Sequence, residues 1–291
     1  MKQMESAQGI VSIIRDYVAS SENTLQNPAG DRAFDEPLVG FSAGSDPLYD
    51  AYKTHVGPFH WAPLEAFSIA FPQVNVSPEE LTVVSWVLPQ AKLTKADNRK
   101  QTVQPSDRWA RARIYGEEFN TKLKRMLVQR LQQEGIAAVA PPLLPDWQKK
   151  ESDGIPYASN WSERHAAYAS GLGTFGLCDG LITPVGKAMR LGSVVVRLQL
   201  PATPRPYTDH HAYCLHFAGQ TCRKCIERCP VQAISEAGHD KTKCARHLKP
   251  VSADYVKSHY GFDGYGCGLC QTGVPCESGI PVRSARIKTA L

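Results

Sequence analysis

Apolar residues near the start of the chain recur at the spacing of a helix. The pattern is carried by Ile10, Val11, Ile13, Ile14, Tyr17 and Val18. Such a stripe predicts an amphipathic helix within residues 1–20. Charged residues interrupt it, so it does not match a secretory signal, and no window approaches the roughly 18 apolar residues of a membrane span. We therefore expect a cytoplasmic protein with no membrane partner.

A second hydrophobic pattern predicts a buried strand. Residues 81–88, LTVVSWVL, are apolar on both faces, rich in β-branched side chains, and end at Pro89. The preceding residues 21–78 interleave aromatic residues with Gly, Pro, Asp and Ser. The aromatic rings need burial while Pro and Gly limit long elements, so we expect irregular structure with short helices wrapped on a core.

A long helix is predicted after this strand. Ser106 is a good N-cap, the helical pattern continues to about Glu134, and Gly135 can end it in the left-handed conformation. A short strand that runs into a proline-rich loop follows in residues 136–145.

The next segment predicts one more helix and two strands. Ser162 can cap a helix whose alanines favour that state and which Gly171 would end. Residues 181–184 and 192–200 then have the composition of strands. Strands that alternate with helices favour an α/β or α+β layer as the fold class.

The glycines of residues 170–180, SGLGTFGLCDG, match G-x-G-x-x-G at Gly171, Gly173 and Gly176. A dinucleotide-binding fingerprint needs its glycines after a strand and before a helix. Here they follow a helix and precede a strand, which argues against NAD. Gly171 is then a helix C-cap, and the other two permit a tight turn or the close approach of a bulky ligand.

The net charge of the chain excludes few classes of binding partner. It has 33 Lys and Arg against 28 Asp and Glu, for a net charge of +5, and the basic residues are scattered. This excess suits an acidic redox partner or a phosphate-bearing ligand and is too small to indicate nucleic acid. We therefore expect no nucleic-acid partner, although the pattern does not exclude tRNA.

Eight of the nine cysteines are concentrated in the last third of the chain, which favours metal over disulfides in a reducing compartment. Pro230 follows one of them, as in the C-x2-C-x3-C-P run of bacterial ferredoxins. Eight thiolates are the number that two [4Fe–4S] clusters need. The eight candidate ligands are Cys214, Cys222, Cys225, Cys229, Cys244, Cys267, Cys270 and Cys276.

In two-cluster ferredoxins the cysteine before proline serves the other cluster. One predicted set, the first thiol set, is therefore Cys214, Cys222, Cys225 and Cys276; the other, the second thiol set, is Cys229, Cys244, Cys267 and Cys270. Both cysteine runs depart from the usual ferredoxin spacing, and the departures fall at Cys214 and Cys276. The assignment of these two residues to a set is therefore the one most affected. A zinc ribbon is the alternative, but it would use only four of the eight cysteines.

Residues 163–196, ERHAAYASGLGTFGLCDGLITPVGKAMRLGSVVV, followed by the cysteine-rich segment, resemble the epoxyqueuosine reductases and the reductive dehalogenases. The resemblance implies a nitroreductase-like, cobalamin-binding core followed by a ferredoxin-like module with two clusters. The implied division is an N-terminal wrap in residues 1–80, the core in residues 81–205 and the module in residues 206–291. The clusters would pass electrons to a base-off cobalamin that reduces the substrate at Co(I).

The resemblance also implies roles for residues of the core. Tyr157 lies near the position of the family's proton donor, with Asp153 as a rival; a tyrosine acid would be dehalogenase-like. The glycines Gly171, Gly173 and Gly176, with Cys178, would approach the corrin, and Lys187 and Arg190 would meet its phosphate or amide groups. Residues of these types more often pack in a core or lie on the solvated surface than bind a cofactor. For His165 as well, a place in the core or on the helix surface is the ordinary role.

The chain ends fifteen residues after Cys276, without the C-terminal repeat domain common in epoxyqueuosine reductases, and no twin-arginine leader begins it. The expectation is therefore a cytoplasmic reductase of a small molecule, supplied by a low-potential donor such as ferredoxin or flavodoxin. One alternative is an electron-transfer or corrinoid-reactivating protein with no corrinoid of its own. Another is a flavin in the core.

Overall fold

The structure is a computed structural model that describes residues 6–152, 155–219 and 222–281. At its centre four strands lie in the order β1-β2-β8-β3, and each neighbouring pair is antiparallel. These strands are β1 Leu38–Ala43, β2 Thr82–Pro89, β8 Met189–Val196 and β3 Ala138–Val139. The expected mixture of helices and sheet is confirmed, and the antiparallel pairing makes the fold α+β.

Strand β2 is the buried strand that the sequence predicts, and it divides the core into two layers. All eight of its residues are buried. Val84, Trp86 and Leu88 point to one layer, whereas Val83 and Val87 point to the other. This alternation follows from the two-residue period of a strand. Because helices cover both faces of the sheet, no side chain of β2 faces solvent.

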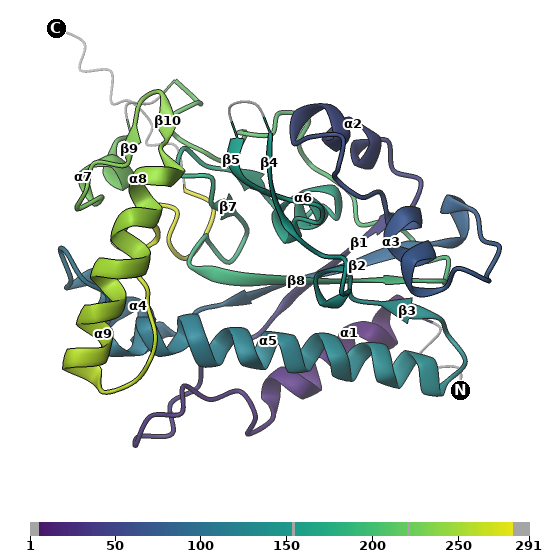
Figure 1. Cartoon of the computed structure of the whole chain (residues 1–291), viewed down its shortest axis with the longest axis horizontal. Coiled ribbons are helices and arrows are strands. Elements are labelled where there is room, and N and C mark those ends of the chain that lie inside the picture. Colours follow the sequence, from purple (N-terminus) through teal and green to yellow (C-terminus); the bar gives the residue numbers. More distant parts are fainter. Residues whose placement is uncertain (1–5, 153–154, 220–221, 282–291) are drawn as a thin grey trace, which may run out of the picture.

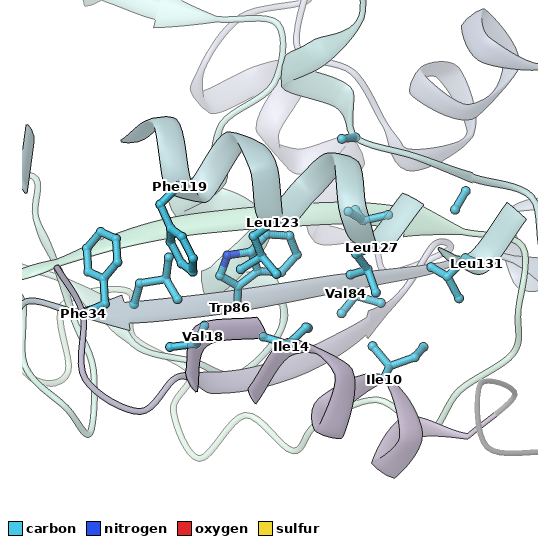
Figure 2. Packing of buried hydrophobic residues seen from close by; sticks show 14 of the residues in the cluster. Ile10, Ile14, Val18, Phe34, Val84, Trp86, Phe119, Leu123, Leu127 and Leu131 are labelled. Atoms are coloured by element: carbon cyan, nitrogen blue, oxygen red, sulfur yellow. The ribbon is translucent and has the colours of Figure 1, made fainter. Parts of the chain in front are cut away.

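One face of the sheet is covered by the N-terminal helix α1 (Ala7–Ala19) and the long helix α5 (Asp107–Gln133) (Figure 1). Figure 2 shows how side chains of both helices meet those of β2. The predicted cap of α5 is present, because the Ser106 hydroxyl accepts a hydrogen bond from the Trp109 amide at 3.3 Å. Gly135 follows the helix with a φ of +79°, as expected of a helix end.

The other face is covered by shorter helices (Figure 1). They are α2 (Leu48–His55), α3 (Pro63–Ala70) and α6 (Glu163–Ala169), with a 3-10 turn at Pro78–Glu80. Short helices within residues 21–78 are thus confirmed. Strand β1 is not predicted by the sequence, because LVGFSA is short and holds a glycine. It is stabilised by its six-residue pairing with β2 and by two hydrogen bonds between Phe41 and Thr203.

Smaller elements complete the region before the cysteines. Helix α4 spans Lys92–Arg99, and a 3-10 turn at Pro141–Leu143 follows β3, as the proline-rich loop predicted. Two hairpins pair β4 (Lys149–Ser152) with β5 (Ile155–Ser159) and β6 (Thr174–Phe175) with β7 (Leu181–Ile182).

The cysteine-rich segment forms short elements at one end of the sheet (Figure 1). They are α7 Lys224–Glu227, β9 Ile234–Ser235, β10 Gly238–His239, α8 Lys241–Arg246, a π-turn His247–Val251, α9 Ser252–Tyr260 and a 3-10 turn Leu269–Gln271. Arg228 joins this segment to α4, because its guanidinium donates to the carbonyls of Asn98 and Gln101. It also donates to the Thr272 carbonyl, so one partly buried guanidinium holds both parts together.

Gly192 of β8 lies directly opposite Trp86 of β2. A Cβ atom at Gly192 would come within 2.4 Å of the indole ring, so glycine is the residue that leaves room for it. The indole N–H donates to the Asn120 side chain of α5 at 2.9 Å. Trp86 therefore links the sheet to the long helix by both packing and a hydrogen bond.

Among the described residues, no helix is long and apolar enough to cross a membrane.

Candidate active site and thiol clusters

A small pocket in the cysteine-rich segment is lined by all four residues of the first thiol set, Cys214, Cys222, Cys225 and Cys276. Three stretches of chain contribute them: the loop after β8, the start of α7 and the end of the described chain. The Cys276 carbonyl accepts from the Lys187 amide at 2.9 Å, which ties the last of these cysteines to the beginning of β8. Four thiols around one pocket suit a group that binds sulfur at several corners.

Thiols of the second set raise one another's pKa. Burial raises the pKa of the Cys267 thiol to about 11, and the neighbouring Cys244 and Cys229 add to that rise. Cys267 in turn acts on Cys270, the fourth member. In the part of the chain that the structure describes, no three Cys, His, Asp or Glu side chains are arranged to hold a single metal ion.

The ninth cysteine, Cys178, lies between the two sets. Its sulfur is in hydrogen-bonding contact with the thiols of Cys225 and Cys270, one from each set, and these contacts lower its pKa although burial opposes them. Lys187 donates to the same sulfur at 3.3 Å. Cys178 is thus a small buried residue that faces the thiols, whereas the corrin contact implied for it by the resemblance remains a prediction.

A larger cavity of about 550 Å³ opens beside the thiols. Its walls come from the β4–β5 hairpin, α6, the end of α2, the loop around residue 210 and the start of α8. Three cations, Lys149, Arg164 and Lys241, face it, against the single carboxylate of Asp179. Lys241 is 3.5 Å from that carboxylate, whereas Lys149 and Arg164 form no carboxylate ion pair in the described chain. The cavity therefore favours an anionic ligand.

Of the two predicted proton donors, Tyr157 lies in this cavity. It is on β5, its side chain lines the pocket, and the residue is 45% exposed. Asp153 lies outside the described residues. His165 also lines the cavity, and its Nδ1 is 2.8 Å from the Ser162 hydroxyl. Burial holds the pKa of His165 down at about 3, so this histidine presents a neutral imidazole to a ligand at neutral pH.

Behind His165, His60 is packed between aromatic rings. It is 1% exposed, its ring stacks on Trp161, and neither ring nitrogen has a hydrogen-bond partner in the described chain. Burial lowers its pKa from 6.5 to about 4. The ring is therefore neutral in the folded protein throughout the range in which an exposed histidine titrates.

We expect acid to destabilise the protein partly through His60. Between pH 6.5 and 4 the unfolded chain binds a proton at this residue that the folded chain does not, so stability present above pH 6.5 is lost as pH falls. The shift corresponds to about 3 kcal/mol. Urea unfolding of wild type and H60F at pH 7 and pH 4.5 measures it. The variant should lose less stability than wild type, whereas H259F, which alters an exposed histidine, should lose as much.

The cavity and the second thiol set are joined by a chain of side chains. His239 Nδ1 lies 3.3 Å from the Asp179 carboxylate, and the same ring is hydrogen-bonded to Cys244. Burial alone would lower the pKa of His239, but these two partners outweigh it and raise the pKa to about 9. Because Asp179 follows Cys178 directly, one short turn has thiols on one side and the cavity on the other.

The glycines of the 170–180 segment contact the protein's own backbone. Gly171 ends α6 with a φ of +75°, as predicted. At Gly173 a Cβ atom would lie 2.2 Å from the Ile182 carbonyl oxygen, across the β6–β7 hairpin. At Gly176 the nearest atom would be the end of the Ile182 side chain, at 3.2 Å, while the Gly180 carbonyl oxygen lies at an ordinary contact distance of 3.4 Å. The order of helix, glycines and strand confirms the sequence argument, and the tight turn accounts for Gly173.

We therefore expect G173A to be much more destabilising than G176A. A methyl group at Gly173 collides with a backbone carbonyl that cannot move away, which costs about 1–3 kcal/mol, whereas a flexible side chain can give way at Gly176. Thermal unfolding of both variants checks this. Equal losses would show that the hairpin does not require the first glycine.

The two cationic residues that the resemblance places against the cofactor, Lys187 and Arg190, lie outside the 550 Å³ cavity. Lys187 is 3% exposed and lines the pocket of the first thiol set. Arg190 is partly buried near α5, and its Nε, 3.8 Å from Glu117, has no hydrogen-bond partner in the described chain. Neither residue lines the 550 Å³ cavity, and the contacts with a cofactor that the resemblance implies for them remain predictions.

Several cavity residues were missed. They are His55, Lys149, Arg164, Asp179, His210, His211 and Lys241. The adjacent pair in DHHAYC, just before the first cysteine, was an available signal for His210 and His211. The His211 ring is held by Phe175, whose carbonyl is 2.9 Å from Nδ1. Nothing in the sequence indicated that lysines of β4 and α8, far apart along the chain, face one cavity.

No family model matches the chain. An epoxyqueuosine reductase of Bacillus anthracis is 27% identical to it over 171 residues, which are 57% of this chain and 40% of that protein. The chain resembles the epoxyqueuosine reductases in sequence. The resemblance expected from residues 163–196 and the cysteines is thereby confirmed, and the match spans about two fifths of the curated relative's length.

Solved structures extend the comparison. An epoxyqueuosine reductase in a crystal with an epoxyqueuosine-modified tRNA stem loop covers 94% of this chain, over 68% of its own, at 17% identity and a TM-score of 0.45. A variant of a catabolic reductive dehalogenase covers 94% of this chain, over 36% of its own, at 13% identity and a TM-score of 0.50. The likeness to the dehalogenase shows that this chain and the dehalogenase share a fold.

Proposed function

We propose that the protein is an iron–sulfur oxidoreductase in which the two thiol sets hold two [4Fe–4S] clusters beside the 550 Å³ cavity. The observation that carries this proposal is the pocket lined by Cys214, Cys222, Cys225 and Cys276. Thiolates in sets of four are the usual protein ligands of such clusters. The curated relatives are named as reductases, which supports the same class of reaction.

The turn at residues 178–179 supports electron delivery into the cavity. Cys178 contacts a thiol of each set, and Asp179 lines the cavity. Electrons supplied one at a time by a ferredoxin or flavodoxin would pass from the clusters to the cavity across this turn. Tyr157, which also lines the cavity, is the residue we propose to donate a proton to the reduced substrate.

A corrinoid is the proposed electron carrier in the cavity, where it would supply a cobalt ion that hands electrons to the substrate. The ring faces of Trp147 and Phe175 and the cations Lys149 and Arg164 suit a flat ring with polar substituents. A complete cobalamin is larger than 550 Å³, so only part of it would be enclosed.

The unpaired cations of the cavity favour an anionic substrate. A small molecule was the expectation from the sequence, but the cationic walls and the names of the relatives make a tRNA carrying epoxyqueuosine the first substrate to test. A cavity of this size also favours an enzyme over an electron carrier, which needs no such space.

The test is anaerobic reconstitution with iron and sulfide, followed by titration with hydroxocobalamin and assay with an epoxyqueuosine stem loop. About eight irons per chain, a base-off Co(II) spectrum and loss of the epoxide support the proposal. The same stem loop carrying queuosine is the matched control. Eight irons without corrinoid uptake would favour a carrier, and one zinc without iron would overturn the proposal.

A further inference from the structure

Lys187 is a buried cation whose polar neighbours are thiols. It is 3% exposed, and its ammonium donates to the Cys178 sulfur at 3.3 Å and is hydrogen-bonded to Cys276. The other groups that act on its charge are the thiols of Cys270 and Cys225. No carboxylate forms an ion pair with it within the described ranges.

A second lysine with the same exposure has the carboxylate partner that Lys187 lacks. Lys124 of α5 is also 3% exposed, and its ammonium lies 3.0 Å from the Glu163 carboxylate. An ammonium taken out of water needs an opposite charge close by, because neutral polar groups do not repay the lost hydration. At Lys187 the anion would be a cluster with its thiolates, which carries a net negative charge.

The backbone holds Lys187 in this place. It follows a turn in which Gly186 has a φ of +88°, and a Cβ atom at Gly186 would lie 2.1 Å from the Glu277 carbonyl oxygen. The Lys187 amide donates to the Cys276 carbonyl. The ammonium is therefore fixed against the first thiol set rather than free to turn to solvent.

We propose that Lys187 raises the reduction potential of the cluster held by the first thiol set, with Cys178 positioning its ammonium. The inference rests on the proposed function, since it needs the clusters. Reduction adds one electron, and so one negative charge, to the cluster. A fixed positive charge nearby, in a site closed to water, stabilises that reduced form more than the oxidised one.

The test is a potentiometric titration of both clusters, followed by EPR, in the reconstituted full chain. K187M removes the charge and keeps an apolar chain, and K187R keeps the charge. The matched control is K224M, because Lys224 lines the same pocket but its side chain is 56% exposed and paired with Glu227 at 2.7 Å. We expect one cluster to shift to a more negative potential in K187M, and little change in K187R or K224M.

The iron content separates this inference from the proposed function. If wild type binds no iron, the proposed function fails. If K187M binds about eight irons per chain and both potentials equal those of wild type, the role of Lys187 is refuted. Loss of one cluster in K187M but not in K187R supports the need for charge, whereas equal loss in both overturns it because shape alone would then matter.

Discussion

Replacing Cys222 with alanine is expected to halve the iron of the reconstituted protein, from about eight atoms per chain to about four. Cys222 lines the pocket of the first thiol set, and a cubane that loses one of four thiolate ligands is not held. C267A should remove the other cluster with the same loss of iron. Iron and sulfide analysis, with EPR of the cluster that remains, measures both.

Cys178 provides the matched control for this prediction. It is buried among the same thiols but belongs to neither set, so C178A should keep about eight irons. Iron loss in C178A equal to that in C222A would show that Cys178 is itself a ligand, and the two sets would have to be redrawn.

Truncating Trp86 to alanine is expected to cost about 3–5 kcal/mol of unfolding free energy. The side chain is fully buried, and its removal leaves a cavity next to a glycine that cannot fill it. The variant also deprives Asn120 of its hydrogen-bond donor. Urea denaturation of the iron-free protein, with wild type treated in the same way, measures the loss.

W86F is the companion variant. It keeps a ring over Gly192 but removes the indole N–H, so we expect a smaller loss than in W86A. If the two variants lost equal stability, the hydrogen bond to Asn120 rather than the packing would be the main contribution of this residue.

The elements predicted best from the sequence are those whose signals are local. The stripe of α1, the apolar run of β2 and the Ser106 cap of α5 each depend on neighbouring residues, and the structure confirms them. Strand β1 was missed because its stability comes from pairing with β2 rather than from its own composition. The direction of pairing depends on how distant segments return to the sheet, which spacing along the chain does not show.

The candidate site, too, was predictable only where its signal lies in neighbouring residues of the sequence. Cysteines that recur at short intervals predicted the thiol sets; the four thiols of the first set line one pocket, whereas the composition of the second set remains a prediction. The basic cavity was not foreseen, because Lys149 and Lys241 meet only after folding. The thiol neighbours of Lys187 were not predicted either, because they depend on the turn at Gly186, which packs on the backbone of Glu277. The contact with a ligand's phosphate or amide groups that the resemblance implies for Lys187 remains a prediction.

The docking of Cys276 on the start of β8 bears on how the protein matures. The first thiol set joins Cys214 to Cys276, which lies 62 residues further along the chain, and the Lys187 amide holds Cys276 in place. A complete cluster site therefore exists only after the sheet has formed and the segment that carries Cys276 has returned to it. We expect iron–sulfur delivery to follow folding of the sheet, which pulse-labelled chains would reveal as protease resistance of the sheet before any iron is taken up.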